Sequence, residues 1–292
     1  MKKKESKIKI FVAHHKPWYI YEDDVYVPIQ VWKKNAKIDL WILWDDTGDN
    51  ISEKNDNYAE LTAQYWVWKN YDLRDVDYVW FCHYRRYLEF KHSVNIKSVI
   101  KIVKYTKCIY KTCCNLFDYI FWYKQILIFD KNFLKYCGKN TLRYISKKRN
   151  DIFLDKAFVS PFYKEKPLKH LWLKNGDLWS VLEKLIIKKY PNFQKYLTEI
   201  QNIQRAHYCN MFVMKKEIFL EYSERLFWIL IELENEIINK WQQNLCMKEP
   251  MTAWTRFMWC LWERLLNLYV YYKKEQWCKI SRTATMIFFQ DV

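Results

Sequence analysis

An apolar strand that ends abruptly in cationic residues restricts how this chain can fold. Residues 78–82 form an apolar and aromatic run, and His83, Tyr84, Arg85 and Arg86 follow it directly. In an open α/β sheet, ligands bind just beyond the carboxyl ends of the strands. Arginine matches phosphate oxygens bidentately, and histidine and tyrosine add directional donors. The pattern predicts a phosphate site at this strand end; the alternative is a basic strand end that pairs with nearby carboxylates.

The first predicted strand ends in a similar way. Residues 8–13 form an apolar run, and His15 and Lys16 follow it within a few positions. Cationic residues after the first strand of such a sheet often contact a nucleotide or a phosphate. Both residues are therefore candidates for ligand binding, although a solvated loop would have the same composition.

A polar turn follows the next apolar run. Residues 38–43 are predicted to form a second strand, and the turn after it contains Asp45, Asp46, Asp49 and Asn50. Carboxylates and amides in such a turn can hold a ribose, a base edge or a metal ion. They can equally cap the helix that comes next.

Two polar residues in the second half of the chain are further candidates. Asp177 precedes a predicted helix over residues 179–189, so it is either the N-cap of that helix or a catalytic carboxylate. Asn210 interrupts the apolar run 207–214, which is predicted to be a strand. Its polar side chain in this apolar run makes Asn210 a candidate site residue.

Glu263 stands in an otherwise apolar stretch of predicted helix. A buried charge there is costly unless it is paired or functional. Glu263 is therefore a candidate functional carboxylate, able to act as a general base. The alternative is a structural ion pair with Arg256 or Arg264.

The chain is large enough to bury a full core, with 292 residues of which 51% are hydrophobic. Its lysine-rich start leads into the first strand without the apolar region of a signal peptide. The apolar run 116–129 contains charged and polar residues and is too short to span a bilayer. These features predict a cytoplasmic or peripheral protein.

Residues 91–150 differ in composition from the rest of the chain. They hold 14 Lys and Arg residues against two Asp residues, a net charge of +12 out of +16 for the whole chain. Aromatic residues are interleaved with these cations. The segment suits an interfacial helix on an anionic membrane surface. Nucleic-acid binding and an ordinary basic helical insertion are the alternatives.

Glycine and tryptophan occur in unusual numbers. The chain has 3 Gly and 16 Trp residues, whereas average usage of about 7% Gly would give roughly 20. Trp32 and Trp44 stand near predicted turns, where the backbone often requires glycine. We interpret part of the tryptophan as glycine encoded by a reassigned UGA codon. The gene would then carry UGA rather than UGG at these positions.

Several blocks in fixed order carry a family resemblance, namely His15 with Lys16 and residues 45–55, 58–62, 65–70 and 83–87. In these blocks the chain resembles a bacterial family of capsular and exopolysaccharide glycosyltransferases. That family was long catalogued only as a domain of unknown function, and it includes β-galactofuranosyltransferases. The resemblance is dense over residues 8–90 and looser over 155–272. In the family pattern, glycine is expected at Trp32, at Trp41 or Trp44, at Trp80 and at Trp259.

The resemblance implies a GT-A-like α/β fold related to the Rossmann fold. This fold would have a mixed sheet, flanking helices, a basic helical insertion and a helical C-terminal part. Residues 1–90 would form the nucleotide-sugar-binding half, residues 91–150 the insertion, and residues 151–292 the acceptor-binding half. The donor-binding residues would be His15, Lys16, Asp45, Asp46, Asp49, Asn50, His83, Tyr84 and Asn210.

The implied reaction is inverting transfer of a sugar, with galactofuranose expected, from a UDP-sugar to a lipid-linked glycan. In such folds the third strand usually ends in an Asp-x-Asp metal site, but His83, Tyr84 and Arg85 occupy that place here. We therefore expect no required cofactor or metal, with Arg85 and Arg86 neutralising the leaving diphosphate. Asp45, Asp46 and Asp49 are the fallback metal ligands, and the base would be Glu263 or Asp177.

The expected place of action is the inner face of the plasma membrane, in capsule, exopolysaccharide or O-antigen synthesis. The predicted partners are the UDP-sugar, the lipid-linked glycan and, through residues 91–150, an anionic membrane surface. Nucleic acid is not favoured as a partner. The alternative from another class of protein is a non-catalytic basic-aromatic module that binds nucleic acid or anionic lipid.

Overall fold

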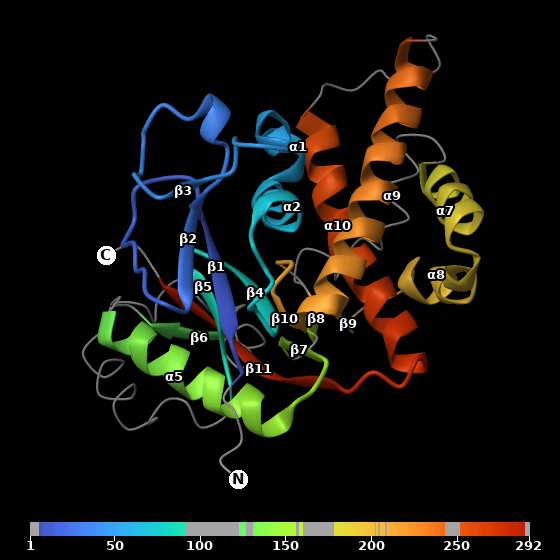
Figure 1. Cartoon of the computed structure of the whole chain (residues 1–292). Helices are drawn as coiled ribbons and strands as arrows, with labels where there is room; N and C mark the ends of the chain where they lie inside the picture. Colours follow the sequence, from blue (N-terminus) through green and yellow to red (C-terminus); the bar gives the residue numbers. More distant parts are fainter. Residues whose placement is uncertain are drawn as a thin grey trace, which may run out of the picture.

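A mixed sheet forms the centre of the protein (Figure 1). The structure is a computed structural model that describes residues 6–90, 123–126, 131–155, 158–159, 178–201, 203, 205–207, 209–242 and 252–289. Within these residues the sheet has nine strands. In spatial order they are β10 (Phe212–Lys215), β7 (Ile152–Asp155), β11 (Ile280–Phe289), β5 (Arg86–Glu89), β4 (Tyr78–His83), β1 (Ile8–His14), β2 (Tyr26–Gln30) and β3 (Leu43–Trp44), with β6 (Tyr123–Ile126) paired to β11.

The N-terminal strands are parallel, as the sequence pattern of an open α/β sheet predicts. β1 pairs in parallel with both β2 and β4, and β2 pairs in parallel with β3. β10 then joins the other side of β4 in the antiparallel direction. The amino end of β10 therefore lies at the same edge of the sheet as the carboxyl ends of β1 and β4. This arrangement places a segment from the second half of the chain beside the predicted phosphate site.

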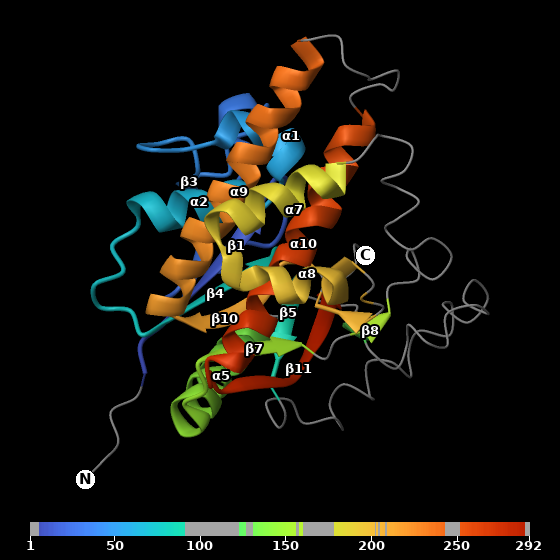
Figure 2. The same ribbon diagram turned by 90° about the vertical axis from the view of Figure 1, so that its right-hand side faces the viewer.

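Helices cover both faces of the sheet (Figures 1 and 2). One face carries α1 (Asn55–Tyr58), α2 (Leu61–Asn70), α7 (Leu178–Lys189), α8 (Gln194–Gln201), α9 (Lys216–Gln242) and α10 (Thr252–Glu275). The other face carries α5 (Lys131–Lys148). Short 3-10 turns lie at η1 (Lys33–Asn35), η2 (Ser52–Lys54) and η5 (Pro191–Phe193), and β8 (Phe158–Val159) pairs with β9 (Arg205–Ala206) in a separate small sheet.

Alternate residues of the central strands enter two separate hydrophobic cores. Phe11 and Phe81 pack with the helices α2, α9 and α10, whereas Ile10 and Trp80 pack on the side of α5. Successive side chains of a strand point to opposite faces. A sheet that is buried on both faces needs apolar residues at nearly every position. This requirement explains the uninterrupted apolar run in residues 78–82.

The second strand lies elsewhere than the sequence predicted. Residues 38–43 were expected to be extended, but the strand next to β1 is β2, and β3 covers only Leu43 and Trp44. Trp41 has a left-handed φ of 56°, which interrupts an extended backbone. The prediction of a strand over 38–43 was therefore wrong in its bounds.

The apolar residues of 57–70 recur at helical spacing, which predicts one helix, but this stretch is broken between α1 and α2. Ala59, between them, has a positive φ of 43°, which is incompatible with a continuous right-handed helix. The helix predicted over 179–189 is present as α7. The apolar residues of 216–239 also recur at helical spacing, and this stretch lies within α9. No helix in the described part of the chain is long and apolar enough to cross a bilayer.

Among the residues that the structure describes, three tryptophans occupy the left-handed backbone region. Trp32, Trp41 and Trp277 have φ angles of 62°, 56° and 62°. This conformation is rare for bulky residues and common for glycine. Trp41 and Trp277 are also 85% and 93% exposed, so their side chains contribute little packing. These positions support the recoding interpretation, which stays a prediction.

Trp44 and Trp80, which were also named from the sequence, do not have left-handed backbone angles. Trp80 is buried in β4, and Trp44 lies in β3. The side chain of Trp259 lies outside the described side chains. Trp66 donates its indole N–H to the carbonyl of Thr47 at 2.8 Å, a side-chain contact that glycine at this position could not make.

Candidate active site

The carboxyl ends of β1 and β4 meet at one edge of the sheet. Ala13 of β1 is in register with His83 of β4, and the backbone N–H of Tyr84 donates to the carbonyl of Ala13 at 3.0 Å. The polar residues that follow the two strands are therefore neighbours in space. Parallel pairing alone produces this placement, because parallel strands end at the same edge.

Tyr84 is the centre of a basic and aromatic cluster at this edge. Its ring centroid lies 5.1 Å from that of His15 and 5.8 Å from that of Trp18. Lys16 Nζ is 5.9 Å from the ring centroid and Arg85 Cζ is 5.0 Å from it. The structure thus brings together three of the predicted donor-binding residues, His15, Lys16 and Tyr84, with Arg85, and these residues come from two different strand ends.

Buried polar atoms without partners lie in the same cluster. His14 Nδ1 and the Tyr84 hydroxyl are buried and have no hydrogen-bond partner in the described structure. Burial, with a smaller effect from His15, lowers the pKa of His14 to about 4, so its ring is neutral at pH 7. Buried polar atoms in native proteins normally have partners, supplied by the protein, water or a ligand. These atoms are therefore suited to ligand binding.

His83 links two distant segments of the chain. Its Nε2 lies 3.1 Å from Glu60 Oε1 and 3.0 Å from the backbone carbonyl of Cys209. A carbonyl oxygen can only accept a hydrogen bond, so Nε2 carries a proton in this arrangement. Burial would raise the pKa of Glu60, but the charge of His83 and its hydrogen bond outweigh burial and hold that pKa below its ordinary value.

Glu263 of α10 reaches the same edge. Its Oε1 accepts a 2.8 Å hydrogen bond from the backbone N–H of Cys209. Burial raises the pKa of Glu263 to about 7, against the opposing effect of that hydrogen bond. The negative charge of Glu60 raises this pKa further, and Arg264 and Arg86 lower it. A carboxylate with such a pKa can accept a proton near neutral pH.

Arg86 is the cation of β5 that contributes to this part of the site. It is the register partner of His83 across the turn between β4 and β5. Its charge lowers the pKa of both Glu60 and Glu263, so it acts on both carboxylates. Arg85 lowers the pKa of His15 instead, after burial and Lys16. The two arginines were predicted to act together. In the structure Arg85 acts on His15, and Arg86 acts on Glu60 and Glu263.

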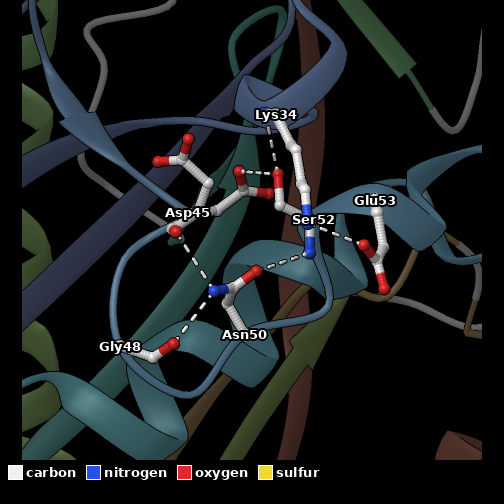
Figure 3. Close-up of polar contacts among 7 residues, drawn as sticks. Lys34, Asp45, Gly48, Asn50, Ser52 and Glu53 are labelled. Carbon is white, nitrogen blue, oxygen red and sulfur yellow. Dashed lines mark hydrogen bonds and ion pairs between the residues drawn. The ribbon is translucent and has the colours of Figure 1, made fainter.

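The predicted carboxylate turn is held together by its own hydrogen bonds (Figure 3). Asp45 is buried and accepts hydrogen bonds from Ser52 Oγ at 2.6 Å and from the backbone N–H groups of Trp32 and Lys33 at 3.1 and 3.2 Å. Asn50 Nδ2 donates to the carbonyl of Gly48 at 2.9 Å. These contacts fix the turn, so a structural role accounts for Asp45 and Asn50.

The other two acidic residues of this turn have different surroundings. Asp49 accepts a 2.9 Å hydrogen bond from the hydroxyl of Tyr65, and Lys69 Nζ lies 3.7 Å from its other carboxylate oxygen. Asp46 Oδ1 is buried without a partner. In the described residues, no three His, Cys, Asp or Glu side chains are grouped as a metal site would require.

Asn210 and Asp177 are the remaining predicted site residues of the second half of the chain. Asn210 is buried, where its Nδ2 donates to Gln64 at 2.8 Å and its Oδ1 accepts from the Tyr222 hydroxyl at 3.3 Å. Its side chain thus joins α2 to α9 next to the site. Asp177 lies outside the described residues. Arg264 donates to the carbonyl of Ile203 at 2.9 Å, and the side chain of Arg256 is not among those described.

Glu60, Cys209 and His14 were not among the predicted site residues. From the sequence Glu60 could face a site, but a helix surface explains it equally well, because the break at Ala59 that turns it inward leaves no sequence signal. Cys209 contributes only backbone atoms, and its left-handed φ of 63° is invisible in the sequence. His14 could have been noticed as the residue that ends the first apolar run.

Comparison with known proteins places the chain in a family. Residues 9–275 match the family described as "Domain of unknown function (DUF4422)". The chain belongs to the DUF4422 family. No curated protein sequence matches it. The family match extends across both halves of the site, from β1 through α10.

The apo structure of WbbM, described as a bifunctional glycosyltransferase, is similar to this DUF4422 chain. The two are 28% identical and superpose with a TM-score of 0.75, covering 98% of this chain and 46% of WbbM. The chain thus spans about half the length of that protein. The mixed sheet with flanking helices is accordingly a GT-A-like α/β fold, as the sequence resemblance implied.

Proposed function

We propose that this DUF4422 chain is a glycosyltransferase that moves a sugar from a UDP-sugar to a lipid-linked glycan. The observation that carries the proposal is Glu263, a carboxylate with a pKa of about 7 that lies at the strand edge under the influence of Arg86. The similarity to a bifunctional glycosyltransferase supports the same class of reaction. Galactofuranose is the proposed sugar, and inversion is the proposed stereochemical outcome.

Glu263 is the proposed general base. It removes the proton from an acceptor hydroxyl while the oxygen attacks the anomeric carbon and the bond from that carbon to UDP breaks. A base is most effective when its pKa lies near the working pH, because it is then both deprotonated and basic. Burial of Glu263 achieves this condition. The Cys209 N–H holds one carboxylate oxygen and leaves the other for the acceptor.

The cations at the strand ends stabilise the departing UDP. His15, Lys16 and Arg85 surround Tyr84, and Arg86 lies on the Glu263 side. Fixed positive groups stabilise charge that develops in a transition state without needing to reorganise. This arrangement supports transfer without a divalent metal, with Asp45, Asp46 and Asp49 as the fallback ligands.

The proposed place of action is the inner face of the plasma membrane, in capsule, exopolysaccharide or O-antigen synthesis. Within the basic segment 91–150, the described helix α5 directs Leu134 and Ile145 into the core of the sheet. The apolar side of α5 is therefore used for folding. The proposed membrane contact rests on the composition of residues 91–130, most of which lie outside the described residues.

Calorimetric titration of UDP into the protein, with and without EDTA, tests the donor site. We expect binding that survives EDTA and weakens at least tenfold in the Arg85→Ala, Arg86→Ala double variant, since phosphate contacts by charged groups contribute about 1.5–3 kcal/mol each. Arg74→Ala is the matched control, because Arg74 is exposed and paired with Asp72. Loss of binding with EDTA would instead assign the diphosphate to a metal on the fallback ligands.

The sugar and the acceptor are tested by turnover. We expect release of UDP from UDP-galactofuranose in the presence of a lipid-linked glycan, and much slower release from UDP-galactopyranose. A protein that binds anionic vesicles or oligonucleotides but neither binds UDP nor releases it would be the non-catalytic basic-aromatic module instead.

A further inference from the structure

Glu60 is a partly buried acid at the strand edge that the proposed reaction does not use. It lies at the start of α2, directly after the backbone break at Ala59. Its carboxylate faces His83 at 3.1 Å, and both side chains are less than a fifth exposed. A carboxylate that only solubilised a helix surface would point to water. The backbone break instead turns this one toward the site.

A chain of contacts joins Glu60 to the proposed base. Glu60 holds His83, whose Nε2 also lies 3.0 Å from the carbonyl of Cys209. The N–H of the same Cys209 donates to Glu263 at 2.8 Å. Both backbone polar groups of Cys209 are thus engaged. One faces the N-terminal half of the chain and the other faces α10.

The segment that carries Cys209 is fixed at its other end as well. The backbone N–H of His207 donates to Asn267 Oδ1 at 3.0 Å, and His207 Nδ1 lies 2.9 Å from the buried Asp155. Asn267 also donates to the carbonyls of His207 and Glu263. Because Asn267 is one turn beyond Glu263 on α10, the segment and the base are held to the same helix.

We propose that Glu60 is a positioning residue of the transfer site, which fixes His83 and, through the backbone of Cys209, the carboxylate of Glu263. This inference rests on the proposed function, because Glu263 is the base only if transfer takes place. Glu60 itself touches neither substrate in this scheme. Its role is to hold Glu263 in place and to supply a negative charge near it.

The charges around Glu263 support this role. Glu60 from the α1–α2 junction raises its pKa, whereas Arg86 from β5 and Arg264 from α10 lower it, as does the N–H of Cys209. Removing the negative charge of Glu60 leaves the effect of Arg86 and Arg264 on Glu263 without the opposing effect of Glu60. The base would then titrate at lower pH, and it would be a weaker proton acceptor at neutral pH.

The test is a titration of Glu263 by NMR, with protein carrying ¹³C in its glutamate carboxyl groups. Glu263→Gln identifies the signal. We expect the midpoint to lie near pH 7 in the wild type and to move down by about one pH unit in Glu60→Gln, the size expected for loss of one nearby like charge. Glu60→Asp keeps the negative charge, so the titration midpoint of Glu263 should stay close to that of the wild type.

Glu53→Gln is the matched control, since Glu53 is exposed on η2 and paired with Lys34. An unmoved Glu263 signal in Glu60→Gln, or an equal shift in Glu53→Gln, would overturn the proposal. The titration needs no substrate. A wild type that fails to bind UDP would therefore refute the proposed function, whereas the coupling between Glu60 and Glu263 would be judged separately.

Discussion

The backbone N–H of Cys209 donates a 2.8 Å hydrogen bond to the carboxylate of Glu263. This contact joins the segment before β10 to the middle of α10. A backbone donor is retained in every substitution at 209 except proline, which has no N–H, so the donor itself does not depend on the cysteine side chain. The properties of the proposed base therefore depend on Glu263 itself and on the charges around it.

Replacing Glu263 by glutamine should abolish most of the proposed transfer activity. Glutamine keeps the acceptor for the Cys209 N–H but cannot take a proton, so we expect a rate loss of about 10²–10⁴-fold. In the wild type, kcat/KM should rise with pH and level off above a midpoint near 7, the pKa of Glu263. Steady-state rates between pH 5 and 9 check both expectations. A variant that retains full activity would exclude Glu263 as the base.

The same substitution should stabilise the fold at high pH. The pKa of Glu263 is about 7 in the folded protein against an ordinary value of 4.5. Between these values the folded state binds a proton that the unfolded state lacks, so the free energy of unfolding of the wild type falls as pH rises.

Glu263→Gln removes that dependence. The variant should match the wild type below pH 4.5 and exceed it by about 3 kcal/mol above pH 7, at 1.36 kcal/mol per unit of pKa difference. Urea denaturation at several pH values measures the difference. If the difference in free energy of unfolding between variant and wild type did not change with pH, the raised pKa of Glu263 would be contradicted.

Gly48→Ala should destabilise the acidic turn. A Cβ at this position would lie 2.2 Å from Asn70 Oδ1, and the backbone φ is +59°. We expect the free energy of unfolding to fall by about 2 kcal/mol from the combined clash and left-handed strain. In the Gly48→Ala, Asn70→Ala double variant the clash is absent, so the loss should be about 1 kcal/mol smaller than the sum of the single losses. Additive losses would contradict the predicted clash.

Glycine at the left-handed tryptophans should stabilise the protein. Each of Trp32→Gly, Trp41→Gly and Trp277→Gly relieves a φ near 60° and should raise the free energy of unfolding by about 1 kcal/mol. Trp66→Gly is the control, and it should lower that free energy by about 3–5 kcal/mol because Trp66 is buried. If all four variants lose stability alike, tryptophan is native at these sites. Sequencing of the gene, for UGA or UGG, gives an independent answer.

The features that sequence reasoning found are those determined by local pattern. The apolar run before His83 predicts a strand with a cationic end, and parallel pairing with β1 then follows from the usual architecture of such sheets. Glu263 could be selected because a charge in an apolar helix is unusual. These residues lie together in the structure because each ends or interrupts an element whose type is evident from its own composition.

The features that were missed depend on pairing between distant segments. Cys209 reaches His83 only because β10 runs antiparallel to β4, and the sequence does not specify that partner. Glu60 reaches His83 only because Ala59 adopts a positive φ. The position of β2 was missed because β3 and the turn around Trp41 carry a similar apolar composition. In each case the deciding interaction joins residues far apart in the chain.

The ring of strands formed by β4, β10, β7, β11 and β5 has a consequence for synthesis of the protein. β11 pairs with β5 although almost two hundred residues separate them, so β5 emerges from the ribosome long before its partner. Contacts this distant in sequence slow folding and leave strand edges exposed meanwhile. The nascent chain must therefore remain soluble with an incomplete sheet until residue 289 has been translated.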